Sequence, residues 1–261
     1  MRCRIEAVGF AAAGLADWDA FQAFFAEANR ELVAGEATPW QSDLLPANER
    51  RRATPAIRQA FQAAEDARRR SRQDFSLLAS VFATADGDMN VLHRICSTLA
   101  VPPRMVSPTD FHNSVQNAAS GYWSIAVRGM LPSTTLAAGD GSFAAGLLEA
   151  ATLAIDGEQA VLLVAYDVPA PAPLAGARPY ARAAGVALVL EPSARLDHAT
   201  LELELSDAPE SACLDPRIEA LRVDNPALRA LPLLERLASR RSGTVALPLS
   251  RGTTLGVMLA P

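Results

Sequence analysis

Two short runs of apolar residues, each bounded by polar segments, constrain the fold of this chain more than any other feature. Residues 75–84 read FSLLASVFAT and residues 160–166 read AVLLVAY. Mostly apolar runs of this length are typical of strands covered on both faces, as in parallel sheets flanked by helices. The sequence therefore predicts a buried sheet with helices packed on it.

Helical patterns alternate with the predicted strands. Thr54 followed by Pro55 marks one helix start, because threonine caps free backbone N–H groups and proline suits the first helical position. Helices are expected over residues 17–32, 54–72, 88–100, 112–128, 143–156 and 226–240, strands over 3–13, 75–84, 133–138, 160–166, 186–191, 199–205, 245–249 and 254–259, and loops over 36–54 and 168–180. This order favours one α/β domain over residues 1–261 with a mixed, mostly parallel sheet.

Composition excludes several classes of function. Half of the 261 residues are hydrophobic, which is enough for a sizeable core, and the formal net charge is −5. An acidic chain is a poor general binder of nucleic acid, so no nucleic-acid partner is expected. The arginine runs at residues 50–52 and 68–70 are interpreted as solvated faces, with a docking patch for an acidic partner as the alternative.

The metal-binding and membrane classes are excluded by spacing and by hydropathy. The histidines His93, His112 and His198 lie far apart, and the three widely spaced cysteines form no CxxC pair. We therefore expect no metal, no cofactor and buried, reduced thiols. Uncharged apolar stretches of membrane-spanning length and a signal peptide are both missing, so a cytoplasmic protein is expected.

One local pattern is typical of a functional turn: a strand, the tetrapeptide GDGS at residues 139–142, and a helix of small residues. Two glycines permit a tight turn that lifts the middle side chain toward the helix N-terminus. Three interpretations remain open. Asp140 caps the helix; Ser142 is a nucleophile, although the turn does not fit GxSxG; or the turn cradles a phosphate, although it lacks GxGxxG and the P-loop lysine.

Longer motifs around this turn resemble the N-terminal half of a β-ketoacyl synthase. They read NSVQNAASGYWSIAVRG, STTLAAGDGSFAAGLLEA, EQAVLLVAYD and RPYARAAGVALVLEP, and RRRATPAIRQAFQAAEDA resembles an early helix of the family. Within the family, HNSVQNAASGYW is most similar to the short chain-length-factor-like proteins of aryl polyene pathways. The resemblance is strongest over residues 107–191. It implies a thiolase-like half-fold, with residues 194–261 expected to complete the sheet.

The resemblance also places Asp140 where the family carries its nucleophilic cysteine and Ser142 at the serine that follows. Thioester chemistry needs a thiolate, and a carboxylate is a poor acyl acceptor. The catalytic histidines and lysine of the family belong to a second half that this chain lacks. The resemblance therefore implies no catalytic residue and no independent ketosynthase activity.

The same resemblance implies an interaction surface. The strand at residues 133–138 would pair with its counterpart in an active ketosynthase subunit, and the helix at residues 112–128 would line an acyl tunnel. Tyr122 and Trp123 have an alternative role as ordinary core or interface aromatics. The candidate binding and interface residues are His112, Asn113, Gln116, Asn117, Tyr122, Trp123, Thr134, Thr135 and Leu136.

The predicted function is a non-catalytic, chain-length-factor-like subunit. It would pair with a β-ketoacyl-ACP synthase in polyketide or fatty-acid-type (aryl polyene) biosynthesis and meet the acyl carrier protein indirectly. One alternative is a small acyl-processing enzyme, a decarboxylase or hydrolase, that uses Asp140 or Ser142. Another is a structural relic that binds carrier protein through its arginine runs.

Overall fold

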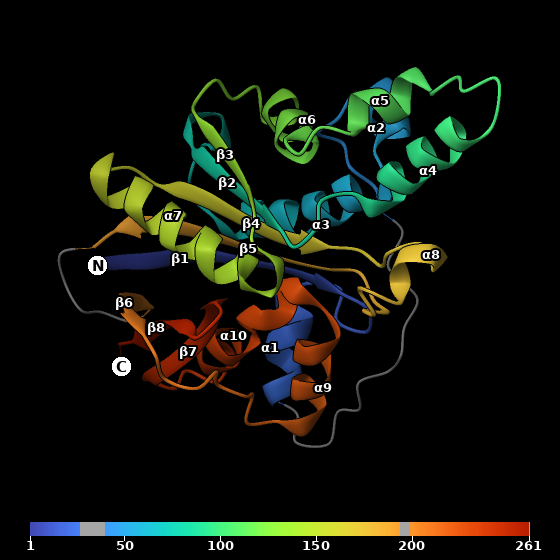
Figure 1. The fold of residues 1–261 in the computed structure, drawn as a ribbon. Helices are drawn as coiled ribbons and strands as arrows, with labels where there is room; N and C mark the ends of the chain where they lie inside the picture. The colour runs from blue at the N-terminus through green and yellow to red at the C-terminus, as the bar shows by residue number, and fades with distance from the viewer. Residues whose placement is uncertain (27–39, 194–198, 261) are drawn as a thin grey trace.

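A computed structural model describes residues 1–26, 40–193 and 199–260, which form an eight-stranded sheet with helices on both faces (Figure 1). The strand order is β3-β2-β4-β5-β1-β6-β8-β7. The strands are β1 (Arg2–Ala12), β2 (Ala79–Thr84), β3 (Ser133–Ala137), β4 (Val161–Asp167), β5 (Ala184–Pro192), β6 (Thr200–Ser206), β7 (Gly243–Ser250) and β8 (Thr253–Leu259). The predicted α/β architecture is confirmed.

The directions of the strands differ from the prediction. β2 pairs in parallel with β3 and β4, whereas β4–β5, β5–β1, β1–β6, β6–β8 and β8–β7 are antiparallel. The expectation of a mostly parallel sheet was therefore wrong, although the sheet is mixed. An apolar run indicates that both faces of a strand are buried. It does not indicate whether the strand runs parallel or antiparallel to its neighbours. Leu162 and Val189 face each other across the antiparallel β4–β5 pair, and both are fully buried.

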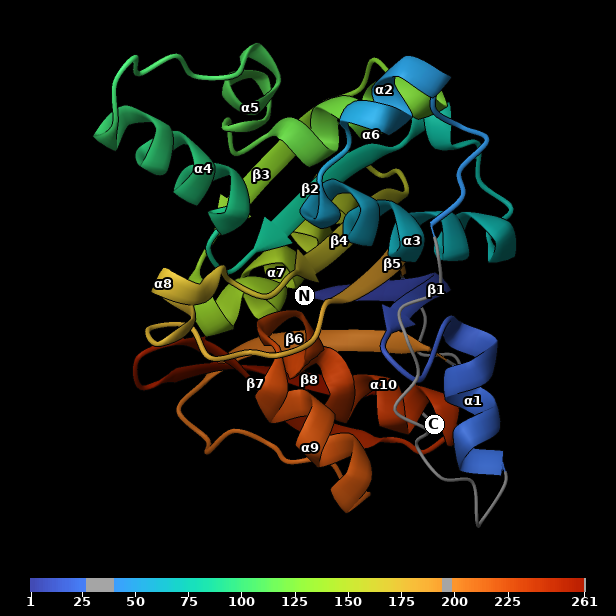
Figure 2. The same ribbon diagram turned by 90° about the vertical axis from the view of Figure 1, so that its right-hand side faces the viewer.

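Helices bury both faces of the sheet (Figures 1 and 2). One face packs against α3 (Pro55–Arg70) and α6 (Ala118–Val127). The other packs against α7 (Ser142–Asp156), η3 (Pro226–Ala230), α10 (Leu231–Ala238), α9 (Pro216–Asp224) and α1 (Trp18–Ala26). Helix α3 approaches β1 so closely that a Cβ on Gly9 would lie 2.1 Å from the Ala63 carbonyl oxygen. Only glycine fits at that crossing.

The predicted helix over residues 112–128 is two helices, α5 (Pro108–Asn113) and α6. The first starts earlier than expected because Ser107 accepts a hydrogen bond from the Asp110 backbone and Pro108 follows it. Ser114 donates from its hydroxyl to the Phe111 carbonyl, one of the local bonds by which serine and asparagine compete with a continuing helix. The break creates the bend on which the candidate site depends.

Other boundaries also differ from expectation. The remaining helices are η1 (Phe75–Leu77), α2 (Ala47–Arg52), α4 (Met89–Ala100), η2 (Gly139–Gly141) and α8 (Ala172–Ala175). The predicted loops over 36–54 and 168–180 thus contain α2 and α8, the predicted helix over 226–240 is split into η3 and α10, and α9 was not predicted. Residues 27–32 of the first predicted helix lie outside the described residues, as does His198.

The segment after residue 199 adds β6, β8 and β7 to the sheet beside β1 (Figure 2). Its helices help to bury the sheet face on which α7 also packs. Leu201, Leu255 and Val257 are fully buried there. This part of the chain therefore supplies the core with side chains from both strands and helices. Among the described residues, none of the helices is long and apolar enough to cross a bilayer.

Candidate functional site

The turn at residues 139–142 joins β3 to α7 and is called the elbow below. Gly139 has a φ of 56°, in the left-handed region that favours glycine. Gly141 is required for a different reason: a Cβ there would lie 2.1 Å from the Leu249 carbonyl oxygen of β7. The elbow is thus in close contact with β7, a strand that lies more than one hundred residues later in the chain.

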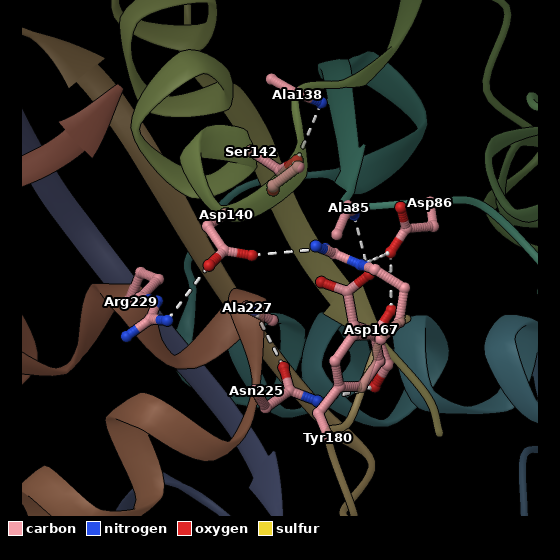
Figure 3. A network of polar contacts seen from close by, with 12 residues as sticks. Ala85, Asp86, Ala138, Asp140, Ser142, Asp167, Tyr180, Asn225, Ala227 and Arg229 are labelled. Atoms are coloured by element: carbon pink, nitrogen blue, oxygen red, sulfur yellow. Dashed lines mark hydrogen bonds and ion pairs between the residues drawn. The ribbon is translucent and has the colours of Figure 1, made fainter. Parts of the chain in front are cut away.

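Asp140 is held by two arginines (Figure 3). Its Oδ1 lies 3.2 Å from Nη2 of Arg178, and its Oδ2 lies 3.1 Å from Nη2 of Arg229 in η3. The carboxylate makes no capping hydrogen bond to α7, so the interpretation of Asp140 as a helix cap was wrong. Two guanidinium groups instead neutralise the side chain and tie it to later parts of the chain.

Ser142 is a structural residue. It is 1% exposed, and its Oγ accepts a hydrogen bond from the Ala138 backbone N–H at 3.0 Å. The hydroxyl faces two carbonyl oxygens, those of Gly139 at 2.7 Å and Thr84 at 2.8 Å. Its single proton and its acceptor capacity are both used within the turn.

Among the described residues, no histidine or lysine lies within hydrogen-bond reach of Ser142 or Asp140. A nucleophile of this type needs a base within hydrogen-bond reach. The chain contains no lysine. His93 lies on α4 beside Ser97, and His112 packs on the ring of Tyr122. The phosphate-cradle interpretation stays a prediction, although the two arginines near the turn are already engaged by the Asp140 carboxylate.

The ion pairs continue from the elbow to the loop after β2 (Figure 3). Arg178 also donates from Nε to the Asp86 carboxylate at 2.6 Å, and the Tyr180 hydroxyl donates to the same oxygen at 2.8 Å. Burial, followed by the bond to Asp86, raises the pKa of Tyr180 above its usual value. Two aspartates and two arginines therefore form a charge-balanced cluster across the elbow.

A buried acid lies beneath this cluster. Asp167, at the end of β4, is 3% exposed and accepts hydrogen bonds from the Ala85 N–H at 2.8 Å and the Thr84 hydroxyl at 2.9 Å. Its Oδ2 has no hydrogen-bond partner. Burial raises the pKa of Asp167 to about 7, and the two hydrogen bonds oppose that rise. Asn225 donates to the Asp167 carbonyl and thereby joins η3 to the end of β4.

A cavity of about 270 Å³ lies beside the elbow, where α3, the α5–α6 link and the ends of β2, β3 and β4 meet. Two of the predicted binding residues, Asn113 and Gln116, line it, together with Ala137 at the end of β3. Asn113 is 3% exposed; its Nδ2 donates to the Arg52 carbonyl at 2.9 Å, whereas its Oδ1 has no hydrogen-bond partner. The cavity therefore reaches from the α5–α6 bend to the strand that leads into the elbow.

A second hollow, the α5–α6 groove, has a volume of about 420 Å³. It shares Val115 and Ala118 with the cavity, so the two hollows adjoin. The full lining is Phe111, His112, Val115, Asn117, Ala118, Gly121, Tyr122 and Ile125, which is predominantly apolar. Three predicted residues, His112, Asn117 and Tyr122, lie here.

The other predicted residues lie along β3 and in the core. The Thr135 hydroxyl lies 3.3 Å from that of Ser120 on α6, Thr134 donates to Glu149 at 3.4 Å, and Leu136 is half-buried. β3 is the end strand of the sheet, so its outer edge is unpaired in the described chain. Trp123 packs against Phe61 at 5.2 Å between ring centroids and lines neither hollow.

The comparison with protein families decides the family. The sequence profile described as "Beta-ketoacyl synthase, N-terminal domain" matches residues 23–246. The chain belongs to this family. The match extends on both sides of residues 107–191, where the motifs are strongest.

Solved structures with the same fold include a chain of "Ketosynthase (ApeO) in Complex with its Chain Length Factor (ApeC) from Xenorhabdus doucetiae", with 21% identity, 99% of each chain covered and a TM-score of 0.75. A chain of "The ishigamide ketosynthase/chain length factor" has 14% identity, 100% and 99% coverage and a TM-score of 0.74. A chain of "AntDE:AntF (apo): type II PKS acyl-carrier protein in complex with its ketosynthase bound to the hexaketide" has 14% identity, 99% coverage of each and a TM-score of 0.72. These matches show a thiolase-like ketosynthase fold. No curated protein sequence matches the chain significantly.

The structure also places the arginine runs and the cysteines. Arg69 and Arg70 pair with the buried Asp66 at 3.0 Å each, and within the other run Arg52 pairs with Glu49 at 3.5 Å. Several of these cations are therefore used within the chain. The free cysteines Cys3 and Cys213 are buried as expected, whereas Cys96 on α4 is exposed, contrary to expectation.

The polar partners of Asp140 were not predicted from sequence. Arg178 and Arg229 lie 38 and 89 residues beyond it. Arg178 begins the motif RPYARAAGVALVLEP, but nothing in that motif points to a contact with Asp140. Asp86 and Asp167 follow predicted strands, and their position at the carboxyl ends of β2 and β4 is the one signal that points to them.

Proposed function

We propose that this chain is a non-catalytic, chain-length-factor-like subunit of a β-ketoacyl-ACP synthase pair. It would act in the cytoplasm in polyketide or fatty-acid-type biosynthesis of the aryl polyene kind. The observation that carries this proposal is Asp140. By resemblance it occupies the position of the family nucleophile, and two arginines hold it.

Neither residue at the elbow is suited to carry an acyl group. A carboxylate neutralised by two guanidinium groups is a weaker nucleophile than a free one, and an acyl anhydride is labile. The Ser142 hydroxyl is buried in hydrogen bonds within the turn. The growing chain must therefore be attached to another polypeptide, which supplies the cysteine and the acid–base groups.

The surface beside the elbow supports pairing. β3 offers an unpaired strand edge, and the hollows next to it are rich in apolar side chains. Open edges and uncovered apolar patches are features that a partner chain covers. An obligate pair of this type would bury more than about 2,000 Å² in total. Two of the solved structures with this fold are of ketosynthases with chain length factors, which supports the same arrangement.

The cavity gives a physical basis for an effect on product length. It is lined by Asn113, Gln116 and Ala137 and would lie near the interface with the synthase. A filled tunnel end resists one more unit by overpacking, which costs about 1–3 kcal/mol. The acyl carrier protein would reach the pair through the synthase subunit.

The test is co-expression of this chain with a catalytic β-ketoacyl-ACP synthase from the same organism. We expect the two proteins to co-purify as a 1:1 complex that condenses malonyl units, whereas this chain alone forms no acyl-enzyme. A charge-reversal variant, R50E/R51E/R52E, should still form the pair, which separates pairing from carrier binding through the arginine run. A chain that stays monomeric beside the synthase would overturn the proposal, as would acylation of the isolated chain at the elbow.

A further inference from the structure

The link between β4 and β5 is attached to the rest of the molecule in an unusual way. Its residues 169–182 are called the lid below; none of them is buried, and none belongs to either apolar core. Core contacts stop at Val168 and resume at Ala183. Because burial of apolar surface is the main source of stability, packing contributes little to holding the lid in place.

Charged and polar contacts hold the lid instead, and Asp86 receives most of them (Figure 3). Arg178 donates from Nε to Asp86 Oδ2 at 2.6 Å, and the Tyr180 hydroxyl donates to the same oxygen at 2.8 Å. Nη2 of Arg178 reaches Asp140 on the elbow at 3.2 Å. The guanidinium carbon of Arg178 lies 5.5 Å from the centre of the Tyr180 ring, so the two side chains also support each other.

A second set of polar contacts holds the far end of the lid. The Ala181 N–H donates to the Asp224 carboxylate at 3.3 Å, and Arg182 lies 3.8 Å from the same carboxylate. The Asn225 side chain donates to the Arg182 carbonyl at 2.8 Å. The backbone on the N-terminal side of the Arg182–Ala183 peptide bond is therefore fixed while the lid is closed.

Closure of the lid determines the charge at two places. Asp167 directly precedes the lid, and its buried Oδ2 has no hydrogen-bond partner. Asp86 lines the cavity of about 270 Å³, and the closed lid neutralises it through Arg178. If the lid opens, water reaches Asp167, and Asp86 is left as an uncompensated carboxylate on the cavity wall. An uncompensated charge makes that wall less suited to an apolar occupant.

We propose that residues 169–182 form an electrostatically latched lid, which opens as a unit without unfolding of the sheet when Arg178 and Tyr180 release Asp86. Ion pairs at a surface contribute little to stability and are screened by salt, so such a latch opens far more easily than a packed element. The inference concerns the isolated chain and is independent of pairing with a synthase.

Trypsin provides the first test. Arg178 precedes Pro179, where trypsin does not cleave, so the bond after Arg182 is the tryptic site of the lid. When opening is fast, cleavage of this bond measures the open fraction. We expect Arg178→Gln to raise the cleavage rate about tenfold, and Tyr180→Phe about threefold, relative to cleavage after the exposed Arg104. Arg2→Gln breaks a surface pair with Glu202 and is the matched control, expected to match the wild type.

Hydrogen exchange of the wild-type chain provides a test without any substitution. The Ala181 amide of the lid should exchange at least a hundredfold faster than the amides of Val186 to Leu190 in β5. Raising NaCl from 50 to 500 mM should speed exchange of the Ala181 amide about threefold or more and leave the β5 amides unchanged, because screening weakens the latch and not the core.

Three results would overturn the inference. The first is tryptic cleavage after Arg182 that is the same in R178Q as in the wild type. The second is an equal increase in R2Q, which would show a general loss of stability and no latch at Arg178. The third is exchange of the Ala181 amide as slow as that of β5, which would mean that the lid opens only when the whole chain unfolds.

Discussion

The elbow and the α5–α6 groove both lie near the cavity at the end of β3, yet their surroundings differ. The elbow is closed by the chain itself: Arg178 and Arg229 bind Asp140, and the Leu249 carbonyl lies against Gly141. The groove is left open, with Phe111 at its rim largely exposed. At the turn where the resemblance places the family's nucleophile, groups from later parts of this chain contact both Asp140 and Gly141. At the surface where we propose that a partner binds, the apolar side chains of the groove are left uncovered.

The largest expected effect on stability comes from substituting one glycine in each region, Gly141 in the elbow and Gly121 in the groove. Gly141→Ala would bring a methyl group within van der Waals contact of the Leu249 backbone, where the free space is far too small. We expect a loss of about 3 kcal/mol or more in unfolding free energy, measured by urea denaturation. Gly121→Ala is the matched control and should be at least as stable as the wild type, because alanine has a higher helix propensity. Equal stability of the two variants would mean that β7 does not press on the elbow.

The next effect concerns the acid beneath the elbow. The pKa of Asp167 is raised from 3.8 to about 7, so folding favours its protonated form. Its contribution to stability is complete below about pH 4 and is lost as the pH rises toward and through 7. At about 1.4 kcal/mol per pKa unit, the part of this rise that lies between pH 5 and 7 corresponds to roughly 2–3 kcal/mol.

Asp167→Asn removes the titration and keeps an acceptor for Thr84 and Ala85. Compared with the wild type, the variant should become relatively more stable as the pH rises from 5 to 8. Thermal melts at several pH values measure this difference. Parallel pH profiles for the two proteins would show that Asp167 does not titrate in this range.

The smallest expected effect on stability is that of removing the Asp140 carboxylate from the elbow. Asp140→Ala leaves Arg178 with Asp86 and deprives Arg229 of its partner. Because the Asp140 side chain is 49% exposed, we expect a loss of only about 1 kcal/mol in stability, measured by denaturant titration. Condensation by the complex should be unchanged, with Asp140→Asn as the isosteric control. Loss of turnover in an intact complex would instead support an enzymatic role for the elbow.

Local signals in the sequence predicted local structure well. Thr54 caps α3 through the Ile57 N–H at 3.3 Å, and α4 and β3 lie close to where periodicity places them. The elbow itself was also located, because two glycines between a strand and a helix form a recognisable turn. Its environment was not predicted, since the groups that close it come from distant segments whose approach depends on the whole fold. The directions of β4 and β5 were missed for a similar reason, because burial on both faces hides the pairing pattern.

The position of β1 in the sheet has a consequence for biosynthesis. β1 lies between β5 and β6, so Cys3 pairs with Pro192 on one side and Leu201 on the other. While the chain emerges from the ribosome, this first strand has no sheet neighbour until β5 has been made. Contacts this distant in sequence slow folding and leave strand edges free to aggregate. High yields of the protein are therefore expected to depend on slow translation or on chaperones that shield its N-terminal strand.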